Sequence, residues 1–145
     1  MSDDTLRSVR IERTSVGRYT VHNVRGGSIP VGTGGDDAFT PVELLLVAIG
    51  GCTSADVDLI TSKRAEPTRF TVSVTGHRVR DEAGGNRMRD LAVEFTVTFP
   101  EGEAGDAARE ALPRAVRISH DRLCTVSRTV ELGTPVSTAI RPSEH

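Results

Sequence analysis

The segment that most constrains the fold runs from Thr40 to Arg64. Thr40 can act as an N-cap, Pro41 fits the first helical position, and Glu43 completes a capping box, so a helix is predicted to begin here. Pro67 lies shortly after Arg64, and the helix is expected to end at about Arg64. At 1.5 Å per residue such a helix would be roughly 36 Å long.

The first half of this helix is apolar or small around nearly its whole circumference, in the stretch LLLVAIGGC. Both sides of that half must therefore be covered by other parts of a protein. One small sheet can cover only one side. A homodimer is the simplest way to cover the other.

The remaining segments alternate apolar and polar residues or carry helix signals. Strands are predicted over residues 8–14, 17–23, 28–32, 70–79, 91–99 and 134–140, and helices over 104–118 (interrupted near Pro113) and from about Cys124 to Leu132. The resulting order is β-β-β-α-β-β-α-α-β, which predicts an α+β layer structure. Residues 1–145 are expected to form one domain, with a mobile tail over 141–145.

Composition and charge exclude several classes of function. The formal net charge is −2, so no broad positive surface is expected for a nucleic acid. The chain has no run of eighteen apolar residues, and its first residues carry acids and arginines instead of an apolar signal core. We therefore expect a cytoplasmic protein that does not bind membranes.

The two cysteines, Cys52 and Cys124, are the candidate reactive groups. They are too far apart for a CxxC motif, and no histidine lies at ligand spacing from Cys52, so neither a metal nor a cofactor is expected. One interpretation is that both are buried and act as small hydrophobic residues.

The sequence around each cysteine favours a reactive role instead. Gly50 and Gly51 precede Cys52 inside a helix, where each costs on the order of 1 kcal/mol relative to alanine, which indicates a close approach of another segment. Cys124 lies at the predicted first turn of a helix, where N–H groups can stabilise a thiolate. We therefore predict that the two sulfurs meet as a redox-active pair.

These segments resemble those of the OsmC and Ohr group of thiol-dependent hydroperoxide reductases. The resemblance lies in TPVELLLVAIGGCTSADV and in LCTVSRTVELGTPV, and the order of elements is similar from about Val9 to Val136. It implies an intertwined homodimer with the long central helix packed on a mixed sheet. It also implies active sites at the subunit interface.

The chemistry implied by the resemblance is peroxide reduction. Cys52 would attack an organic or fatty-acid hydroperoxide and become a sulfenic acid, Cys124 would resolve it as a disulfide, and an external dithiol would reduce the disulfide. An arginine and a glutamate support this step in the best-known branch. The matching residues here are Arg18 and Glu43, although the family glutamate directly follows the proline, where this chain has Val42.

Three alternatives remain open at this point. Glu43 is also explained by a capping box with Thr40, without any chemistry. His120, Arg122 or Arg128 could supply the positive charge near Cys52. The departure at Val42 favours a second hypothesis, a stress-related or small-molecule-binding protein of the same fold with weak or no peroxidase activity.

Overall fold

The computed structural model describes residues 4–142, which divide into two compact units after Val47. Helix α1 (Pro41–Thr61) begins in unit 1 (residues 1–47) and continues in unit 2 (residues 48–145). The described elements are helices and antiparallel strands, which confirms the α+β class. The single-domain organisation stays a prediction.

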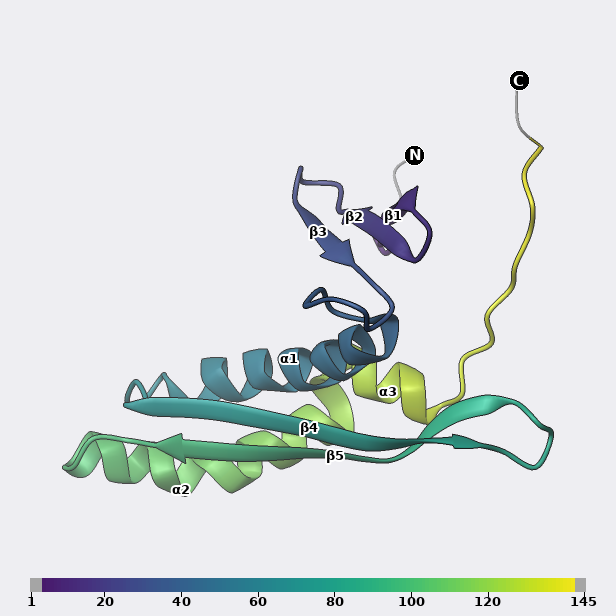
Figure 1. Ribbon diagram of the computed structural model, residues 1–145. Helices are drawn as coiled ribbons and strands as arrows, with labels where there is room; N and C mark the ends of the chain where they lie inside the picture. Colours follow the sequence, from purple (N-terminus) through teal and green to yellow (C-terminus); the bar gives the residue numbers. More distant parts are fainter. Residues whose placement is uncertain (1–3, 143–145) are drawn as a thin grey trace. The chain divides into compact units, whose positions relative to one another are not determined.

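Unit 1 contains a three-stranded antiparallel meander of β1 (Arg10–Ser15), β2 (Arg18–His22) and β3 (Ser28–Val31), shown in Figure 1. The neighbouring strands pair in chain order, as the sequence predicts. Gly17 closes the first turn with a φ of 71°, a conformation that suits glycine because it has no Cβ.

Helix α1 begins with the predicted capping box. The Thr40 N–H donates to Glu43 Oε1 at 2.8 Å, and the Glu43 N–H donates to Thr40 Oγ1 at 3.2 Å. The helix ends at Thr61, earlier than expected, because the Arg64 N–H bonds to the Thr61 carbonyl at 3.0 Å in a tighter turn.

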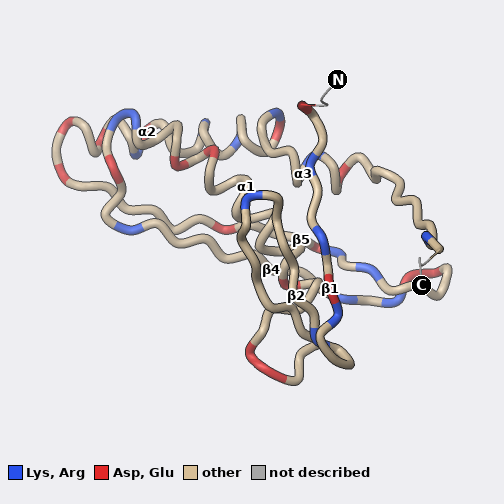
Figure 2. The backbone as a smooth tube through the Cα atoms, turned by 90° about the horizontal axis from the view of Figure 1, so that it is seen from above, with Lys and Arg blue, Asp and Glu red and all other residues tan. Residues whose placement is uncertain are grey.

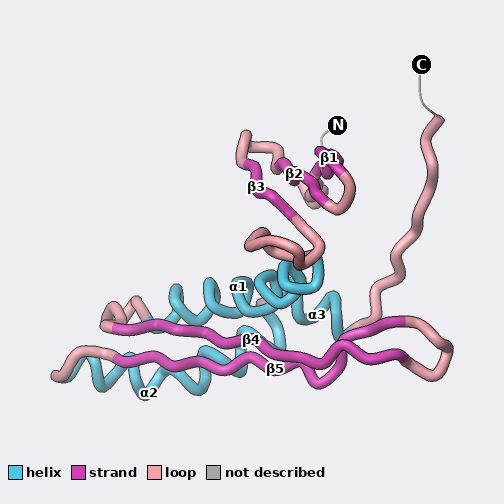
Figure 3. The backbone as a smooth tube through the Cα atoms, in the orientation of Figure 1, coloured by secondary structure: helices cyan, strands magenta, loops and turns pink. Residues whose placement is uncertain are grey.

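Unit 2 is built around a long hairpin of β4 (Arg69–Arg80) and β5 (Asn86–Thr98), as Figure 3 shows. Its side chains alternate between half-buried and exposed, which confirms the predicted period-two pattern. Phe70 and Phe95 meet edge to face on the half-buried side, with ring centroids 6.2 Å apart.

The helices after the hairpin differ from the expectation at one point. Helix α2 (Glu103–Ile118) is not interrupted, although Pro113 lies inside it. A π-helical turn, η1 (Ser119–Leu123), follows directly, and helix α3 (Thr125–Glu131) begins after Cys124. The proline removes one N–H donor, but the helix continues to the η1 turn.

Two further expectations about the sheets are wrong. Residues 134–140 form no strand within the described chain, and Val136 and Ile140 are almost fully exposed there. A strand needs a partner edge, and these residues pair with none in residues 4–142. Both sheets are antiparallel, not mixed. Of the predicted mobile tail, residues 143–145 lie outside the described residues.

Gly50 allows the unit 2 part of α1 to pack closely on the hairpin. A Cβ built on Gly50 would collide with the Val74 side chain of β4, whereas a Cβ on Gly51 would meet no described heavy atom within 4 Å. The predicted need for close approach is therefore confirmed for Gly50. It is not confirmed for Gly51, which is exposed.

This difference gives a paired prediction on stability. Gly50→Ala should lower the free energy of unfolding by about 1–3 kcal/mol, because the added methyl group overpacks the contact with Val74. Gly51→Ala should leave it unchanged or raise it by up to about 1 kcal/mol through helix propensity. Urea unfolding of both variants measures the difference, and equal effects would contradict the packing account.

By length and composition alone, helix α1 is long and apolar enough to cross a membrane. Two observations favour a core helix instead. Asp56 and Asp58 lie in its second half, and Gly50 packs on β4.

Charged residues of both signs are interspersed along the two units in Figure 2. In α2, for example, Arg109 pairs with Asp106 at 2.6 Å. Ion pairs of this exposed kind contribute little to stability.

Candidate functional site

The structure brings the two cysteines together in unit 2. Cys52 comes from α1 and is half-buried, while Cys124 lies between η1 and α3 and is fully buried. The two side chains lie within hydrogen-bonding reach of each other, and both are free thiols. The expected meeting of two sulfurs remote in the sequence is therefore seen.

The backbone after η1 places Cys124 as the N-cap of α3. The Cys124 N–H bonds to the Ser119 carbonyl at 2.8 Å, which closes the π-helical turn, and φ and ψ of −74° and 101° turn the chain into α3. Cys124 Sγ then accepts the Ser127 N–H at 3.3 Å. Sulfur here takes the place that a serine or aspartate oxygen usually has at an N-cap.

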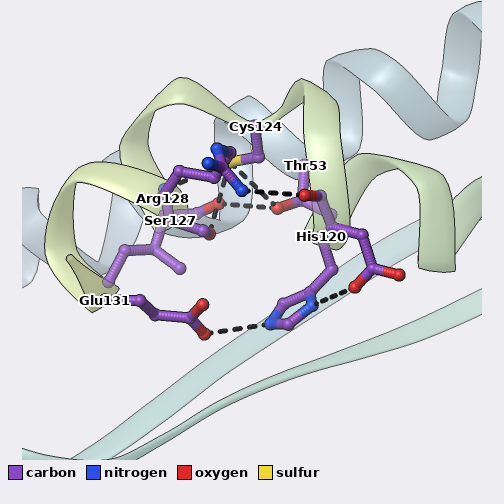
Figure 4. Close-up of polar contacts among 8 residues, drawn as sticks. Thr53, His120, Cys124, Ser127, Arg128 and Glu131 are labelled. Carbon is purple, nitrogen blue, oxygen red and sulfur yellow. Dashed lines mark hydrogen bonds and ion pairs between the residues drawn. The ribbon is translucent and has the colours of Figure 1, made fainter.

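Two hydroxyl groups also contact Cys124 Sγ. Thr53 Oγ1 lies at 3.5 Å and Ser127 Oγ at 3.3 Å, as Figure 4 shows. Burial by itself would raise the pKa of Cys124, but hydrogen bonds from the Ser127 hydroxyl, the Thr53 hydroxyl and the Ser127 N–H together hold this pKa below its ordinary value.

The pKa of Cys52 moves the other way. Burial raises it, and the neighbouring Cys124 sulfur raises it further, while the backbone N–H groups of Val126 and Thr125 lower it in part. The two neighbouring sulfurs therefore differ in how readily they ionise, with the pKa of Cys124 lowered and that of Cys52 raised.

Asp56 follows Cys52 by one helical turn and could have raised its pKa as an unpaired carboxylate. The structure gives it another partner, because the Ser119 hydroxyl donates to Asp56 Oδ2 at 2.8 Å. Ser119 is fully buried, so this bond also ties η1 to α1.

A cavity of about 260 Å³ lies within unit 2, and neither cysteine is part of its wall. Thr53 and Ser127, the two hydroxyl residues that contact Cys124, form part of its wall. Most of the remaining wall is apolar and comes from α1, β5, α2 and α3, through Ile49, Leu91, Val93, Phe95, Val116 and Val130. An apolar group of modest size can therefore lie next to the residues that surround Cys124.

His120 and Glu131 complete the wall of this cavity. His120 Nε2 lies 2.9 Å from Glu131 Oε1, as Figure 4 shows, and His120 Nδ1 lies 3.0 Å from Asp121 Oδ1. The hydrogen bonds to Asp121 and Glu131 raise the pKa of His120. The His120 side chain thus links η1 to α3.

This bridge predicts a pH dependence of stability. A pKa that is higher in the folded state gives stabilisation that is complete below the unfolded value of about 6.5 and is lost as the pH rises through the folded value. The melting temperature should therefore fall as the pH is raised from about 6.5 through the folded pKa of His120, and it should fall less in His120→Asn. His77→Asn is the matched control, because His77 is an exposed histidine on β4. A fall of the same size in His120→Asn and the wild type would contradict a role for the bridge.

Arg18 and Glu43 both lie in unit 1 and have partners there. Arg18 forms an ion pair with Asp36, and Glu43 forms the capping box with Thr40. Neither appears among the groups that shift the pKa of Cys52. Arg128 donates to the Asp121 carbonyl at 2.9 Å, and Arg122 is exposed.

Sequence reasoning did not identify Thr53 and Ser127 as parts of the site. Ser127 could have been found, because a residue three positions after an N-cap normally supplies the N–H that the cap accepts. Thr53 gave no such signal, since its contact with Cys124 joins two distant segments. Within residues 4–142, no group of three or more His, Cys, Asp or Glu residues is arranged to hold a metal ion.

Comparison with known proteins gives a consistent assignment. A family model described as OsmC-like protein matches residues 34–139. An uncharacterized protein of Mycobacterium tuberculosis is 30% identical over 129 residues, which cover 88% of this chain and 90% of that protein.

Two solved structures share the fold. An OsmC-like protein of unknown function from Vibrio cholerae superposes with a TM-score of 0.72 at 14% identity, covering 90% of this chain and 95% of that one. The organic hydroperoxide resistance protein OhrB of Bacillus subtilis gives a TM-score of 0.54 at 14% identity, covering 86% of this chain and 90% of that one. At these identities the likeness is one of fold.

Proposed function

Because the chain belongs to the OsmC-like protein family, we propose that it is a thiol-dependent peroxidase that reduces organic or fatty-acid hydroperoxides. The observation that carries the proposal is the contact between Cys52 and Cys124, two free thiols from different elements of one unit. Such a pair can be oxidised to a disulfide and reduced again without a cofactor.

In the proposed reaction, the Cys52 thiolate attacks the distal oxygen of the hydroperoxide. The O–O bond breaks, the alkoxide leaves and takes a proton, and Cys52 becomes a sulfenic acid. Cys124 then attacks the Cys52 sulfur, an S–S bond forms, and hydroxide leaves. An external dithiol supplies the two electrons that reduce the disulfide.

The cavity lined in part by Thr53 and Ser127 supports the substrate class. Its wall is mainly aliphatic and aromatic, so an alkyl or aryl hydroperoxide gains more from entering it than hydrogen peroxide does. The Bacillus subtilis protein of the same fold is named for organic hydroperoxide resistance, which points the same way.

We also propose that the protein acts as an intertwined homodimer in the cytoplasm, without a nucleic acid or membrane partner. Exposed apolar side chains support the dimer: Phe39 is 53% exposed in unit 1, and Leu59 is 70% exposed in unit 2. Through the resemblance, Arg18 and Glu43 are proposed to stabilise the Cys52 thiolate and to protonate the leaving alkoxide.

Steady-state turnover tests the proposed function. The reduced protein, dithiothreitol and either cumene hydroperoxide or hydrogen peroxide are mixed, and peroxide loss is followed. The proposal predicts sustained consumption of cumene hydroperoxide and slower consumption of hydrogen peroxide. Consumption at the rate of dithiothreitol alone with both substrates would refute it.

A second function is favoured by one observation in the structure. Glu43 forms the capping box with Thr40. Burial and the neighbouring Cys124 sulfur raise the pKa of Cys52, which disfavours its thiolate. A binding or stress-related protein with weak peroxidase chemistry would fit these facts. It predicts tight binding of an apolar ligand in the cavity and slow thiol oxidation.

Glu43→Gln separates a catalytic role of Glu43 from its capping role. Glutamine also completes a capping box, so the helix start and the melting temperature should be retained. If Glu43 protonates the alkoxide, turnover should fall by about a hundredfold, the lower range for general acid catalysis. Unchanged turnover would show that Glu43 acts only as a cap.

A further inference from the structure

Cys124 Sγ has more hydrogen-bond donors around it than a neutral thiol requires. The Ser127 N–H, the Ser127 hydroxyl and the Thr53 hydroxyl all lie within 3.3–3.5 Å of it. Thr53 and Ser127 are themselves buried, at 5% and 9% exposure, so water cannot substitute for them freely. A buried anion needs donors of this kind to offset its lost hydration.

Thr53 has one hydroxyl proton and two acceptors in reach. Thr53 Oγ1 lies 3.1 Å from the Ile49 carbonyl and 3.5 Å from Cys124 Sγ. When Cys124 is a thiol, the Thr53 hydroxyl can donate its hydrogen bond to the Ile49 carbonyl, and the Cys124 thiol can donate to Ser127 Oγ at 3.3 Å. When Cys124 is a thiolate, both hydroxyls can turn their protons toward the sulfur without any backbone movement.

We propose that Thr53 and Ser127 are positioning residues that hold Cys124 as a preformed thiolate, so that it resolves the Cys52 sulfenic acid before a second peroxide arrives. The inference rests on the proposed function. In this step the Cys124 thiolate attacks Cys52 Sγ, the S–S bond forms, the S–O bond breaks, and the hydroxide that leaves takes a proton from a buffer acid in the solvent. No further oxidant is consumed.

The charged side chains of Asp56 and His120 have hydrogen-bond partners other than the two sulfurs. Asp56 accepts the Ser119 hydroxyl, and His120 bridges Asp121 and Glu131. The hydrogen bonds that lower the pKa of Cys124 are the ones that would hold it as a thiolate once Cys52 has become a sulfenic acid. The rate of disulfide formation matters because a sulfenic acid that persists is oxidised by a second peroxide to a sulfinic acid, which is irreversible.

The first test measures how Cys52 divides between disulfide and sulfinic acid in excess cumene hydroperoxide, by intact mass. Thr53→Val and Ser127→Ala should each raise the sulfinic fraction about tenfold, since each removes one hydrogen bond to a charged group. Thr53→Ser, which keeps the hydroxyl, should restore the wild-type ratio. Ser54→Ala is the matched control, because Ser54 Oγ donates to the Gly50 carbonyl at 2.6 Å and not to either sulfur within residues 4–142.

The second test needs no peroxide. In a Cys52→Ala background, the ultraviolet absorbance of the thiolate is followed against pH. Thr53→Val or Ser127→Ala should reduce the thiolate fraction of Cys124 at neutral pH about tenfold, and Ser54→Ala should not. Unchanged titrations and sulfinic fractions, in variants with the wild-type circular dichroism, would overturn the inference. If the wild type forms no disulfide, the proposed function fails, while the titration still decides the inference.

Discussion

Cys52→Ser is expected to lower turnover of cumene hydroperoxide by at least about a thousandfold, because it removes the nucleophile and the atom that is oxidised. A serine hydroxyl does not ionise near neutral pH and cannot form a sulfenic acid. Stopped-flow or coupled assays of peroxide loss measure the effect. The fold should persist, since Cys52 is half-buried and serine is nearly isosteric.

The control for this variant is Ser54→Ala, on the same helix and without contact to either sulfur in the described chain. It should keep wild-type turnover. Retention of more than about a tenth of the wild-type rate by Cys52→Ser would show that another group reduces the peroxide. In that case Cys124, which carries the lowered pKa, becomes the candidate nucleophile.

Cys124→Ser should have the second-largest effect, and on a different step. The first equivalent of peroxide should still oxidise Cys52, but no disulfide can form. Intact mass should then rise by about 16 Da for the sulfenic acid and by about 32 Da in excess peroxide for the sulfinic acid. Wild-type protein in excess peroxide should mainly lose about 2 Da instead, for a disulfide.

Serine is the informative replacement at this position because Cys124 also caps α3. Serine can accept the Ser127 N–H as the sulfur does, whereas Cys124→Ala loses the cap and should cost about 1 kcal/mol of stability. A Cys124→Ser variant that turns over indefinitely, with no sulfinic acid in excess peroxide, would contradict a resolving role.

Local signals in the sequence predicted the secondary structure well where the neighbours in sequence determine it. The capping box of Thr40 and Glu43 forms as expected, and the alternating residues of β4 and β5 form the predicted hairpin. The stop at Gly133 also agrees, since its φ of 64° ends the last helix.

The secondary-structure prediction was wrong for three segments that local sequence patterns do not determine. Residues 134–140 have strand-like residues but find no strand to pair with in the described chain, and Pro113 does not interrupt α2. The π-helical turn at Ser119–Leu123 was not foreseen, although its closing bond from the Cys124 N–H places that sulfur. No local pattern distinguishes such a turn from an ordinary helix end.

The candidate site was predicted in part. The meeting of Cys52 and Cys124 was expected from their local contexts and from the resemblance of both segments to a family. The Thr53 hydroxyl was missed because it reaches Cys124 only when α1 packs against the start of α3, whereas Ser127 lies three residues after the N-cap and could have been found. The roles of Arg18 and Glu43 stay predictions.

One measurement tests the central claim most directly. Reduced protein is treated with one equivalent of cumene hydroperoxide, alkylated, digested without reductant and analysed by mass spectrometry. The account predicts rapid loss of both thiols and a peptide pair joined through Cys52 and Cys124. Both thiols still alkylated after the peroxide is added, or a lasting oxidation of Cys52 with Cys124 free, would contradict it.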